Sequence, residues 1–389
     1  MGKRISLGLL FTVNEGWIGG TYYILNLIHA LGTLPDAEQP NLVILSNRTA
    51  DYEVAQQTGY RYLQYRNPYQ YKRNWLEAAV NKGLRMLLGN DVIDKRLSGK
   101  EVSAIFPAVD DAVFDQVPHK IYWMPDFQHC YYPQFFEAWE LAHRNQFLAK
   151  VGAGNSRLVL SSAAAAADWA QTAFQKHCPV TVIPFAVTHP PIDGYAIETL
   201  LQQFGLPAQY FIVCNQFWQH KNHMVVLQAI QALQQAGVTC HVVFTGKPDD
   251  YRNPGYYNQL LAFIDAAGIA SQVHLLGLID RGAQLCLMQH AVAVIQPSLF
   301  EGWSTVVEDA KALGTAVIAS NLAVHQEQLG SNGTYFNATD AEALAEIIAT
   351  YLQQGSSVPP IDYSLHIQQF GKRFYSMLQQ VVAGNEAGA

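Results

Sequence analysis

Short apolar runs and longer amphipathic runs alternate along most of the chain. In the first half, apolar runs typical of buried strands occupy residues 5–13, 42–45, 103–106, 121–124, 158–160 and 181–183. Amphipathic runs predict helices at residues 21–34, 136–150 and 163–175, and another that follows the polar, Tyr- and Arg-rich segment 60–73 and ends near residue 88. This alternation predicts a parallel sheet with helices on both faces.

The second half repeats the same alternation. Strands are expected at residues 210–214, 241–245, 273–276, 291–296 and 316–319, and helices at 222–235, 341–353 and 365–382. Between the two halves, residues 184–207 contain four prolines and show little periodicity, which predicts a linker. The expected fold class is therefore α/β, with two Rossmann-like domains that face a central cleft.

Composition narrows the class of protein. A chain of 389 residues is too long for one ordinary core and suits two domains. Half of the residues are apolar and only 14% are charged, which indicates a globular protein and excludes a disordered one. A formal net charge of −7 argues against nucleic acid as the main partner.

Cysteine usage and the start of the chain indicate the compartment. Five scattered cysteines without a C-x-x-C pair give no disulfide or zinc framework and fit a reducing cytoplasm. The apolar run near the amino terminus stops at Asn14 without a small-residue cleavage site, so we expect a buried strand there and no signal peptide. No stretch approaches the length of a membrane span. We therefore expect a cytoplasmic protein.

The stretch P-S-L-F-E-G-W-S-T-V-V-E-D-A-K-A-L-G, residues 297–314, lies between two expected strands. A strand, a polar loop and a helix start form the place where open α/β sheets bind ligands. The amides of Gly302, Trp303 and Ser304 should point out of the first helical turn, where they are suited to an anion or a sugar oxygen. Thr305 and Glu308 form a capping-box pattern, T-x-x-E.

Two adjacent acids follow this loop. The capping box gives Glu308 a duty at the helix start, and Asp309 has no such duty and is free to face the cleft. Which of the two contacts a ligand stays open from the sequence.

Other positions suit phosphate binding or proton transfer. Lys221 lies between an expected strand and an expected helix, the usual place for a cation that binds phosphate. Gly19 and Gly20 open the first helix without the G-x-G-x-x-G spacing, so binding of NAD is not supported. His129 follows a strand end, with Asp126 placed to orient it.

Metal-binding patterns are absent from the sequence. It contains no D-x-D, no H-E-x-x-H and no His/Cys cluster. No metal site is therefore expected.

The stretch after residue 300 resembles the signature of the glycosyltransferase group 1 family. That pattern has a first Glu, a Gly-aromatic pair, a second Glu eight positions later and then Ala-x-Ala-x-Gly. Here the first Glu is Glu301, the pair is Gly302-Trp303 and the tail is residues 310–314, while Asp309 replaces the second Glu. The resemblance implies a GT-B fold, with an acceptor-side domain (1–188 plus a helix at 365–389 that crosses back) and a donor-binding domain (189–364).

The resemblance also implies roles for individual residues. Lys221 would hold the donor diphosphate, Glu301 the donor sugar and the second acid the ribose, with His129 near the reaction centre. Gln216 replaces an arginine of the family, and His220, His223 and the helix start at Asn222 are the three candidates to compensate for it. The expected catalytic residues are thus His129, Lys221 and Glu301. The expected substrate-binding residues are Gly19, Gly20, Gln216, His220, Leu278, Ile279, Gly302, Trp303, Ser304, Thr305, Glu308 and Asp309.

The implied activity is metal-independent transfer of a sugar from a nucleotide-sugar donor, with retention of configuration. The implied acceptor is a glycan or a lipid-linked glycan in polysaccharide biosynthesis, which would bring the protein to a membrane surface, and no cofactor besides the donor is expected. Two alternatives stay open. One is an epimerase or hydrolase of sugar nucleotides with the same fold, and the other is a non-catalytic partner that binds sugar nucleotides, which the Gln216 and Asp309 departures favour.

Overall fold

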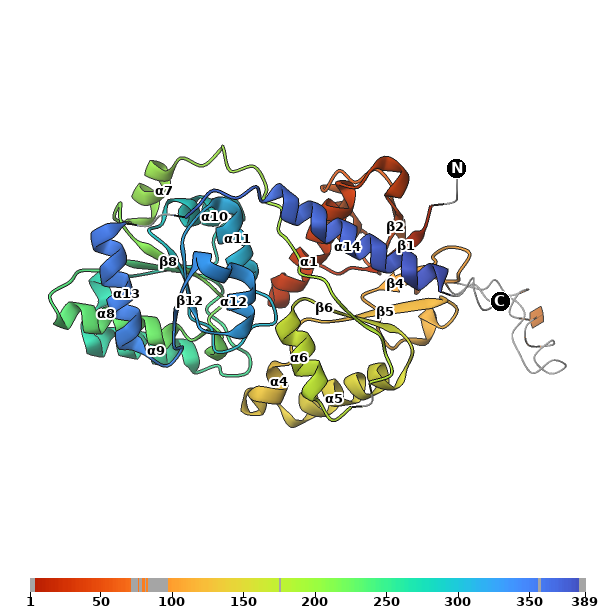
Figure 1. The fold of residues 1–389 in the computed structure, drawn as a ribbon, viewed down its shortest axis with the longest axis horizontal. Coiled ribbons are helices and arrows are strands. Elements are labelled where there is room, and N and C mark those ends of the chain that lie inside the picture. The colour runs from red at the N-terminus through yellow and green to blue at the C-terminus, as the bar shows by residue number, and fades with distance from the viewer. Residues whose placement is uncertain are drawn as a thin grey trace.

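The chain folds around two parallel β-sheets, each flanked by helices. A computed structural model describes residues 4–70, 97–174, 176–355 and 358–384, together with positions 76, 79, 80 and 82. The two sheets lie in two lobes that meet along a central interface (Figure 1). This is the architecture that the alternation of apolar and amphipathic runs predicts.

The first sheet has seven strands. In sheet order they are β3 (Leu63–Arg66), β2 (Asn41–Leu45), β1 (Ser6–Leu10), β4 (Ala104–Phe106), β5 (His119–Met124), β6 (Arg157–Leu160) and β7 (Val180–Val182). The helices of this domain are α1 (Ile18–Gly32), α2 (Thr49–Gln56), α4 (Gln128–Tyr131), α5 (Ala138–Ala153) and α6 (Ala163–Gln171), with short 3₁₀ helices at Glu15–Trp17, Asp36–Glu38, Ala112–Phe114 and Pro133–Phe135.

The second sheet has six strands. In sheet order they are β10 (Val273–Gly277), β9 (Val242–Thr245), β8 (Phe211–Cys214), β11 (Val294–Gln296), β12 (Val317–Ser320) and β13 (Gly333–Phe336). Its helices are α7 (Ile197–Phe204), α8 (His223–Gln235), α9 (Tyr256–Ala267), α10 (Arg281–His290), α11 (Thr305–Leu313), α12 (Ala323–Leu329) and α13 (Ala341–Gln354), with 3₁₀ helices at Gln219–Lys221, Ala270–Gln272 and Gly330–Asn332.

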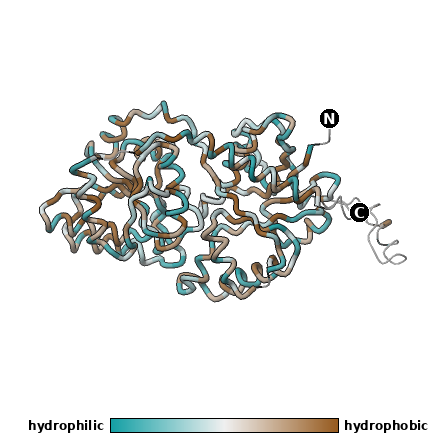
Figure 2. The backbone as a smooth tube through the Cα atoms, in the orientation of Figure 1, coloured by the Kyte–Doolittle hydropathy of each residue, from teal (hydrophilic) through white to brown (hydrophobic). Residues whose placement is uncertain are grey.

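The strands in the middle of each sheet are largely apolar because both faces of each sheet are covered. Every residue of β8, β9 and β12 is buried, and separate hydrophobic clusters fill the two sides of each sheet. Figure 2 shows hydrophobic chain concentrated in the middle of each lobe and hydrophilic chain on the outer helices and loops. Continuous apolar strands are the signature of parallel sheets with helices on both faces.

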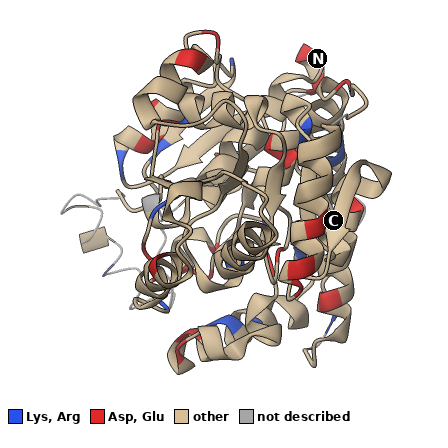
Figure 3. Cartoon of the chain, turned by 90° about the vertical axis from the view of Figure 1, so that its left-hand side faces the viewer, with Lys and Arg blue, Asp and Glu red and all other residues tan. Residues whose placement is uncertain are grey.

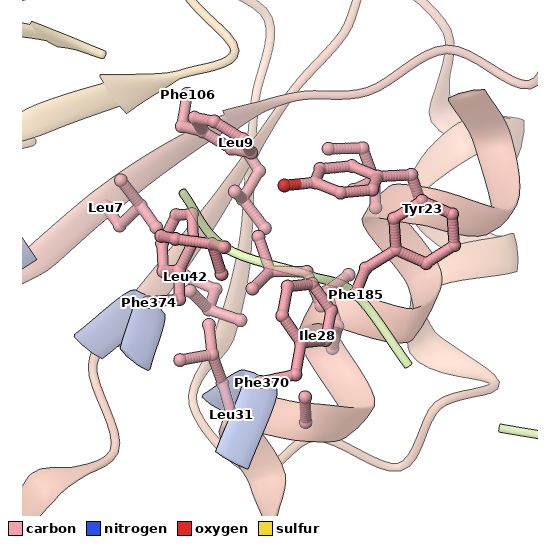
Figure 4. Close-up of a cluster of buried hydrophobic side chains, with 14 of the residues drawn as sticks. Leu7, Leu9, Tyr23, Ile28, Leu31, Leu42, Phe106, Phe185, Phe370 and Phe374 are labelled. Carbon is pink, nitrogen blue, oxygen red and sulfur yellow. The ribbon is translucent and has the colours of Figure 1, made fainter. Parts of the chain in front are cut away.

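The last helix, α14 (Ser364–Ala383), packs on the first domain. It lies beside α1 in Figure 1, and Figure 4 shows Phe370 and Phe374 among the side chains of β1, α1 and β4. A β-carbon on Gly371 would come within 2.2 Å of the carbonyl oxygen of Ala30, so glycine is what allows the two helices to approach so closely. The expected crossing of the last helix to the first domain is confirmed.

Several sequence-based boundaries need correction. The prediction of a linker at 184–207 is wrong for its second half. Helix α7 forms there and buries Leu200 with its apolar face, and the prolines on either side hid this periodicity in the sequence. Helix α1 begins at Ile18, three residues earlier than predicted. Strand β3 forms inside the segment predicted to be polar, because its tyrosine and leucine side chains are half-buried. Most of the helix predicted to end near residue 88 lies outside the described residues.

A buried hydrogen bond fixes the chain where it crosses between the domains. The hydroxyl of Tyr363 donates to Oε2 of Glu308 (2.6 Å) and accepts from the amide of Val187 (3.1 Å). We expect Tyr363→Phe to lower the free energy of unfolding by about 1–3 kcal/mol, because it leaves a buried carboxylate oxygen without its donor. Urea unfolding measures this difference.

Tyr351→Phe is the matched control. The hydroxyl of Tyr351 forms a partly exposed hydrogen bond with Oγ1 of Thr334 (2.8 Å), so we expect its loss to cost about 1 kcal/mol or less. Equal costs for the two variants would contradict a special contribution from the Tyr363–Glu308 pair.

Candidate functional site

A cavity of about 780 Å³ lies between the two domains. Its walls come from the carboxyl ends of β1, β5, β8 and β11 and from the helix starts that follow them. This is the edge where parallel sheets bind ligands, and the volume falls in the usual range for small-molecule sites. Of the predicted site residues, the cavity collects Gly19, Gly20, Gln216, His220, Lys221, Glu301, Gly302, Trp303, Ser304 and Thr305.

Lys221 and Glu301 meet in this cavity. Nζ of Lys221 lies 2.6 Å from Oε1 of Glu301, and the same oxygen accepts from Nε2 of Gln296 (2.8 Å) and Oγ of Ser298 (2.7 Å). Both charged side chains are mostly buried. The pair is therefore a fixed charge pair, and Nζ keeps further N–H donors for a ligand.

The loop that carries Lys221 is hydrogen-bonded to the loop that carries Glu301. Asn222, in the left-handed region at φ 57°, donates from Nδ2 to the carbonyls of Pro297 (3.0 Å) and Ala338 (2.7 Å). The amide of Leu299 donates to the carbonyl of His220 (2.8 Å). Because these bonds join the two loops directly, residues 80 positions apart in the chain keep one geometry.

His220 lies beside Lys221 and is neutral. Burial lowers its pKa well below the usual value, and the charges of Lys221 and Arg252 lower it further. A neutral imidazole in this place adds no positive charge for a phosphate. The compensation that we expected from His220 for the Gln216 replacement is therefore restricted to hydrogen bonding.

Two helices begin at the cavity. Gly19 and Gly20 lie in the first turn of α1, and Thr305 and Val306 are the first two residues of α11. Within the described part of the chain, no oxygen accepts from the amides of Thr305 and Val306. Free amides and the positive ends of two helix dipoles thus face the same space, an arrangement suited to an anion.

The predicted role of the Ser304 amide is wrong. That amide donates to Oε1 of Gln328 (3.0 Å), so it is not available to a ligand. Ser304 instead caps α11, with Oγ accepting from the amide of Val307 (3.3 Å). Because the cap is Ser304, the capping box predicted for Thr305 and Glu308 does not form.

The loop before α11 contacts the first domain. A β-carbon on Gly302 would lie 1.8 Å from the carbonyl oxygen of Pro125, and Nε1 of Trp303 donates to the carbonyl of Phe185 (3.0 Å). The ring of Phe300 packs against Tyr131, with the ring centroids 5.2 Å apart. Gly302 is therefore required because the backbone of the other domain approaches it.

His129 does not line the cavity. It is the second residue of α4 and is buried, with its ring 6.2 Å from that of Phe136. Oδ1 of Asp126 accepts from the amide of Gln128 (3.0 Å) and does not orient the histidine. The cavity is lined by Asp126 instead, so the prediction of His129 as a catalytic residue is not supported by its position.

Neither of the two adjacent acids lines the cavity. Besides Tyr363, the Glu308 carboxylate accepts from Nζ of Lys311 (2.9 Å) and Nε2 of Gln328 (3.0 Å). Oδ1 of Asp309 accepts from the guanidinium of Arg281 (2.5 Å) and lies 2.9 Å from Nε2 of His189. Both acids are buried in structural contacts, which the motif could not reveal because all of these partners except Lys311 lie 20 or more positions away in the sequence.

The contacts of Asp309 predict a dependence of stability on pH. Burial alone would raise the pKa of Asp309, but the charge of Arg281 and hydrogen bonds from His189 and Arg281 hold it below its usual value of 3.8. A carboxyl whose pKa is lowered on folding stabilises the protein above its unfolded-state pKa, and this contribution is lost as the pH falls through the folded-state pKa.

We therefore expect Asp309→Asn to lower the free energy of unfolding at neutral pH by about 1–3 kcal/mol, because Arg281 loses its charged partner. The difference in the free energy of unfolding between the variant and the wild type should become smaller as the pH falls below 3.8. Urea titrations across the acid range measure it, and a gap independent of pH would contradict an ionic role.

Leu278 and Ile279 also lie outside the cavity. They follow β10; the side chain of Leu278 is 78% exposed, and that of Ile279 packs against a core cluster. The cavity wall instead contains several residues that the sequence did not identify, because they belong to no motif. They are Asn14, Trp17, Trp123, Gln128, Arg144, Tyr251 and Arg252.

Two other features are absent from the described residues. No group of three or more His, Cys, Asp or Glu side chains is arranged to hold a metal ion. No helix in the described ranges has the length and apolar character needed to cross a membrane. Figure 3 shows acidic and basic residues interspersed on the side of the molecule that it presents.

Comparison with protein families identifies the second domain. Residues 198–362 match the model of the family described as glycosyl transferases group 1. The second domain is a group 1 glycosyltransferase domain. This match covers the Lys221 loop, the Glu301 loop and α11, so it agrees with the resemblance that the sequence motif carries. A comparison with curated proteins finds no match.

Solved structures of glycosyltransferases share the fold over the whole chain. Anabaena Alr3699/HepE in complex with UDP and glucose has 15% identity and a TM-score of 0.63, with 98% of this chain and 96% of that one covered. A glycosyltransferase from Rickettsia africae has 13% identity and a TM-score of 0.61, with coverages of 100% and 98%. WaaG, a glycosyltransferase involved in lipopolysaccharide biosynthesis, has 13% identity and a TM-score of 0.56, with 98% of each chain covered. The protein is a glycosyltransferase with the GT-B fold.

Proposed function

We propose that this glycosyltransferase moves a sugar from a nucleotide-sugar donor to a glycan or lipid-linked acceptor, with retention of anomeric configuration and without a metal ion. The observation that carries the proposal is the 2.6 Å contact between Lys221 and Glu301 in a cavity where two helices begin. UDP and glucose occupy the related HepE structure, which supports a sugar nucleotide as the class of donor.

In the proposed reaction, the bond between C1 of the donor sugar and the diphosphate oxygen breaks, and the acceptor hydroxyl oxygen bonds to C1 on the same face. The proton of the acceptor hydroxyl passes to the departing phosphate oxygen. Negative charge grows on the diphosphate as it leaves, and Lys221 and the amides of Thr305 and Val306 stabilise it. These groups supply the positive charge that a metal ion supplies in other enzymes.

Glu301 has a positioning role in this scheme. Its Oε1 is occupied by Lys221, Gln296 and Ser298, so it holds the ammonium in place and presents its remaining oxygen to the sugar. Asp126 is the carboxylate that the first domain contributes to the cavity. Retention through a front-face route requires no covalent sugar on Asp126, whereas a two-step displacement would form one.

The test is turnover with UDP-, GDP- and dTDP-sugars and a panel of glycan acceptors, in buffer containing a chelator. We expect a glycoside product with the anomeric configuration of the donor, and no mass increase on Asp126 when the acceptor is withheld. An inverted product, a requirement for added metal or a sugar-modified Asp126 would each contradict the corresponding part of the proposal.

A second candidate is a non-catalytic partner that binds sugar nucleotides in a glycan assembly complex. Gln216 offers no charge where the family has arginine, and Arg281 and His189 hold the carboxylate of Asp309, so two positions implied in donor binding are altered. Donor binding without turnover, free nucleotide release or epimerisation would favour this candidate. Release of the sugar to water, or a change of its configuration while still bound to the nucleotide, would instead favour the hydrolase or epimerase.

A further inference from the structure

Two arginines of the cavity wall, from different domains, converge on one buried ring. Cζ of Arg144, on α5, lies 4.9 Å from the centroid of Phe136, and Cζ of Arg252, on the loop after β9, lies 4.1 Å from it. Both guanidinium groups line the cavity that holds Lys221 and Glu301. Because both Cζ atoms lie within 4.9 Å of one ring centroid, the two guanidinium groups border the same part of the cavity.

Neither arginine is neutralised by a carboxylate. Among the described residues, no ion pair includes Arg144 or Arg252. Neighbouring acids have other partners, since Glu140 accepts from the hydroxyl of Tyr251 (3.1 Å) and Asp250 from the amide of Gln219 (2.9 Å). Two partly buried cations without counter-charges leave this part of the wall electropositive.

A third donor at the same place has no partner. Gln128 is 4% exposed and lines the cavity, and its Oε1 accepts from NH1 of Arg252 (3.3 Å). Its Nε2 is buried and makes no hydrogen bond within the described part of the chain. A buried donor without an acceptor is costly, and a ligand oxygen in the cavity would remove that cost.

The charge of this wall acts on neighbouring groups. Arg252 contributes to the lowered pKa of His220, and Arg144 contributes to the lowered pKa of His129, in both cases after burial. The two histidines are therefore kept neutral beside the arginines.

We propose that Arg144, Arg252 and Nε2 of Gln128 form a subsite for an anionic group, a carboxylate or phosphate, on the acceptor. This proposal rests on the proposed function, since it names the class of acceptor for the same cavity. Guanidinium forks match the oxygens of carboxylate and phosphate, and two cations without an ion-pair partner in the described ranges, beside one donor without an acceptor there, fit a group that only accepts.

The acceptor is favoured over the donor because of where the groups lie. Arg144, Gln128 and Phe136 belong to the first domain, opposite Lys221 and the start of α11 in the second. In the proposed function, Lys221 and the starts of two helices already bind the donor diphosphate. Arg252 comes from the second domain, but the other two members of the subsite lie on the facing wall, and this suits the molecule that approaches the donor.

The test measures binding to the full chain by calorimetry, with and without UDP, for three sugars that differ in charge: glucose, glucuronate and glucose 6-phosphate. We expect the wild type to bind the charged sugars about tenfold more tightly than glucose, and Arg144→Gln and Arg252→Gln each to remove most of that preference. Gln128→Leu should reduce it as well, while the affinity for UDP and glucose stays unchanged in all three variants.

Arg61→Gln is the matched control, because Arg61 also stands over an aromatic ring, 5.4 Å from the centroid of Tyr62, on the exposed surface outside the cavity. It should alter none of these affinities, and melting temperatures verify that each variant folds. No preference for charged sugars in the wild type, or its survival in both arginine variants, would overturn the subsite.

A loss of UDP affinity equal to the loss for charged sugars would assign the arginines to the donor and also overturn the subsite. Failure of the proposed function gives a different result: the wild type would then bind no nucleotide, while the preference among the three sugars would still report on the subsite.

Discussion

Lys221→Ala is expected to reduce the rate of sugar transfer about 100- to 1000-fold, the effect of removing one donor that stabilises charge in a transition state. The reason is the position of Nζ, 2.6 Å from Glu301 in the cavity, where it faces the negative charge that develops on the leaving diphosphate. Turnover at saturating donor measures this effect. The fold should survive, because Glu301 keeps its hydrogen bonds from Gln296 and Ser298.

Lys247→Ala is the control for the loss of a positive charge near the same domain edge. Lys247 pairs with Asp249 on the surface, where its side chain is 49% exposed, and it does not line the cavity. We expect normal activity in this variant. If Lys221→Ala retained the activity of Lys247→Ala, the assignment of Lys221 to the leaving group would be wrong.

Gly302→Ala should lower kcat/KM about 100-fold, since a displacement of about 1 Å in a reacting group can have that effect. The new methyl group would lie 1.8 Å from the carbonyl oxygen of Pro125, and a backbone carbonyl cannot rotate away as a side chain can. Either the Glu301 loop must move or the two domains must separate. Kinetics measures the loss, and small-angle scattering shows whether the domains have moved apart.

Gly194→Ala provides the comparison. No atom lies within 4 Å of a β-carbon at Gly194, and its backbone is not in the left-handed region, so we expect neither activity nor shape to change. Normal kinetics in Gly302→Ala would show that the contact with Pro125 does not position Glu301.

Local patterns in the sequence predicted the two-sheet architecture and placed Lys221 and Glu301 after strands, and the family resemblance implied that both bind one donor. Apolar runs such as residues 210–214 and 241–245 mark buried strands wherever they occur, and a cation or an acid directly after such a run must lie at the carboxyl edge of the sheet. Strands β8 and β11 are neighbours, so their following loops meet.

The functions of Glu308, Asp309 and Gly302 could not be predicted in the same way. Their contacts come from Tyr363, Arg281 and Pro125, and the partners of the two acids bond through side chains that show no periodicity of their own. Arg144 and Arg252 illustrate the same limit. Each lies in a segment without a motif, and only the packing of the two domains brings them to one ring.

The position of α14 has a consequence for how the protein forms on the ribosome. Phe370, Phe374 and Met377 complete the hydrophobic cluster of the first domain, although almost the whole second domain is synthesised before them. During translation, the face of α1 that receives these side chains stays exposed to water while residues 189–363 emerge. The first domain, although first out of the exit tunnel, therefore completes its core last, and an apolar face stays uncovered in the interval.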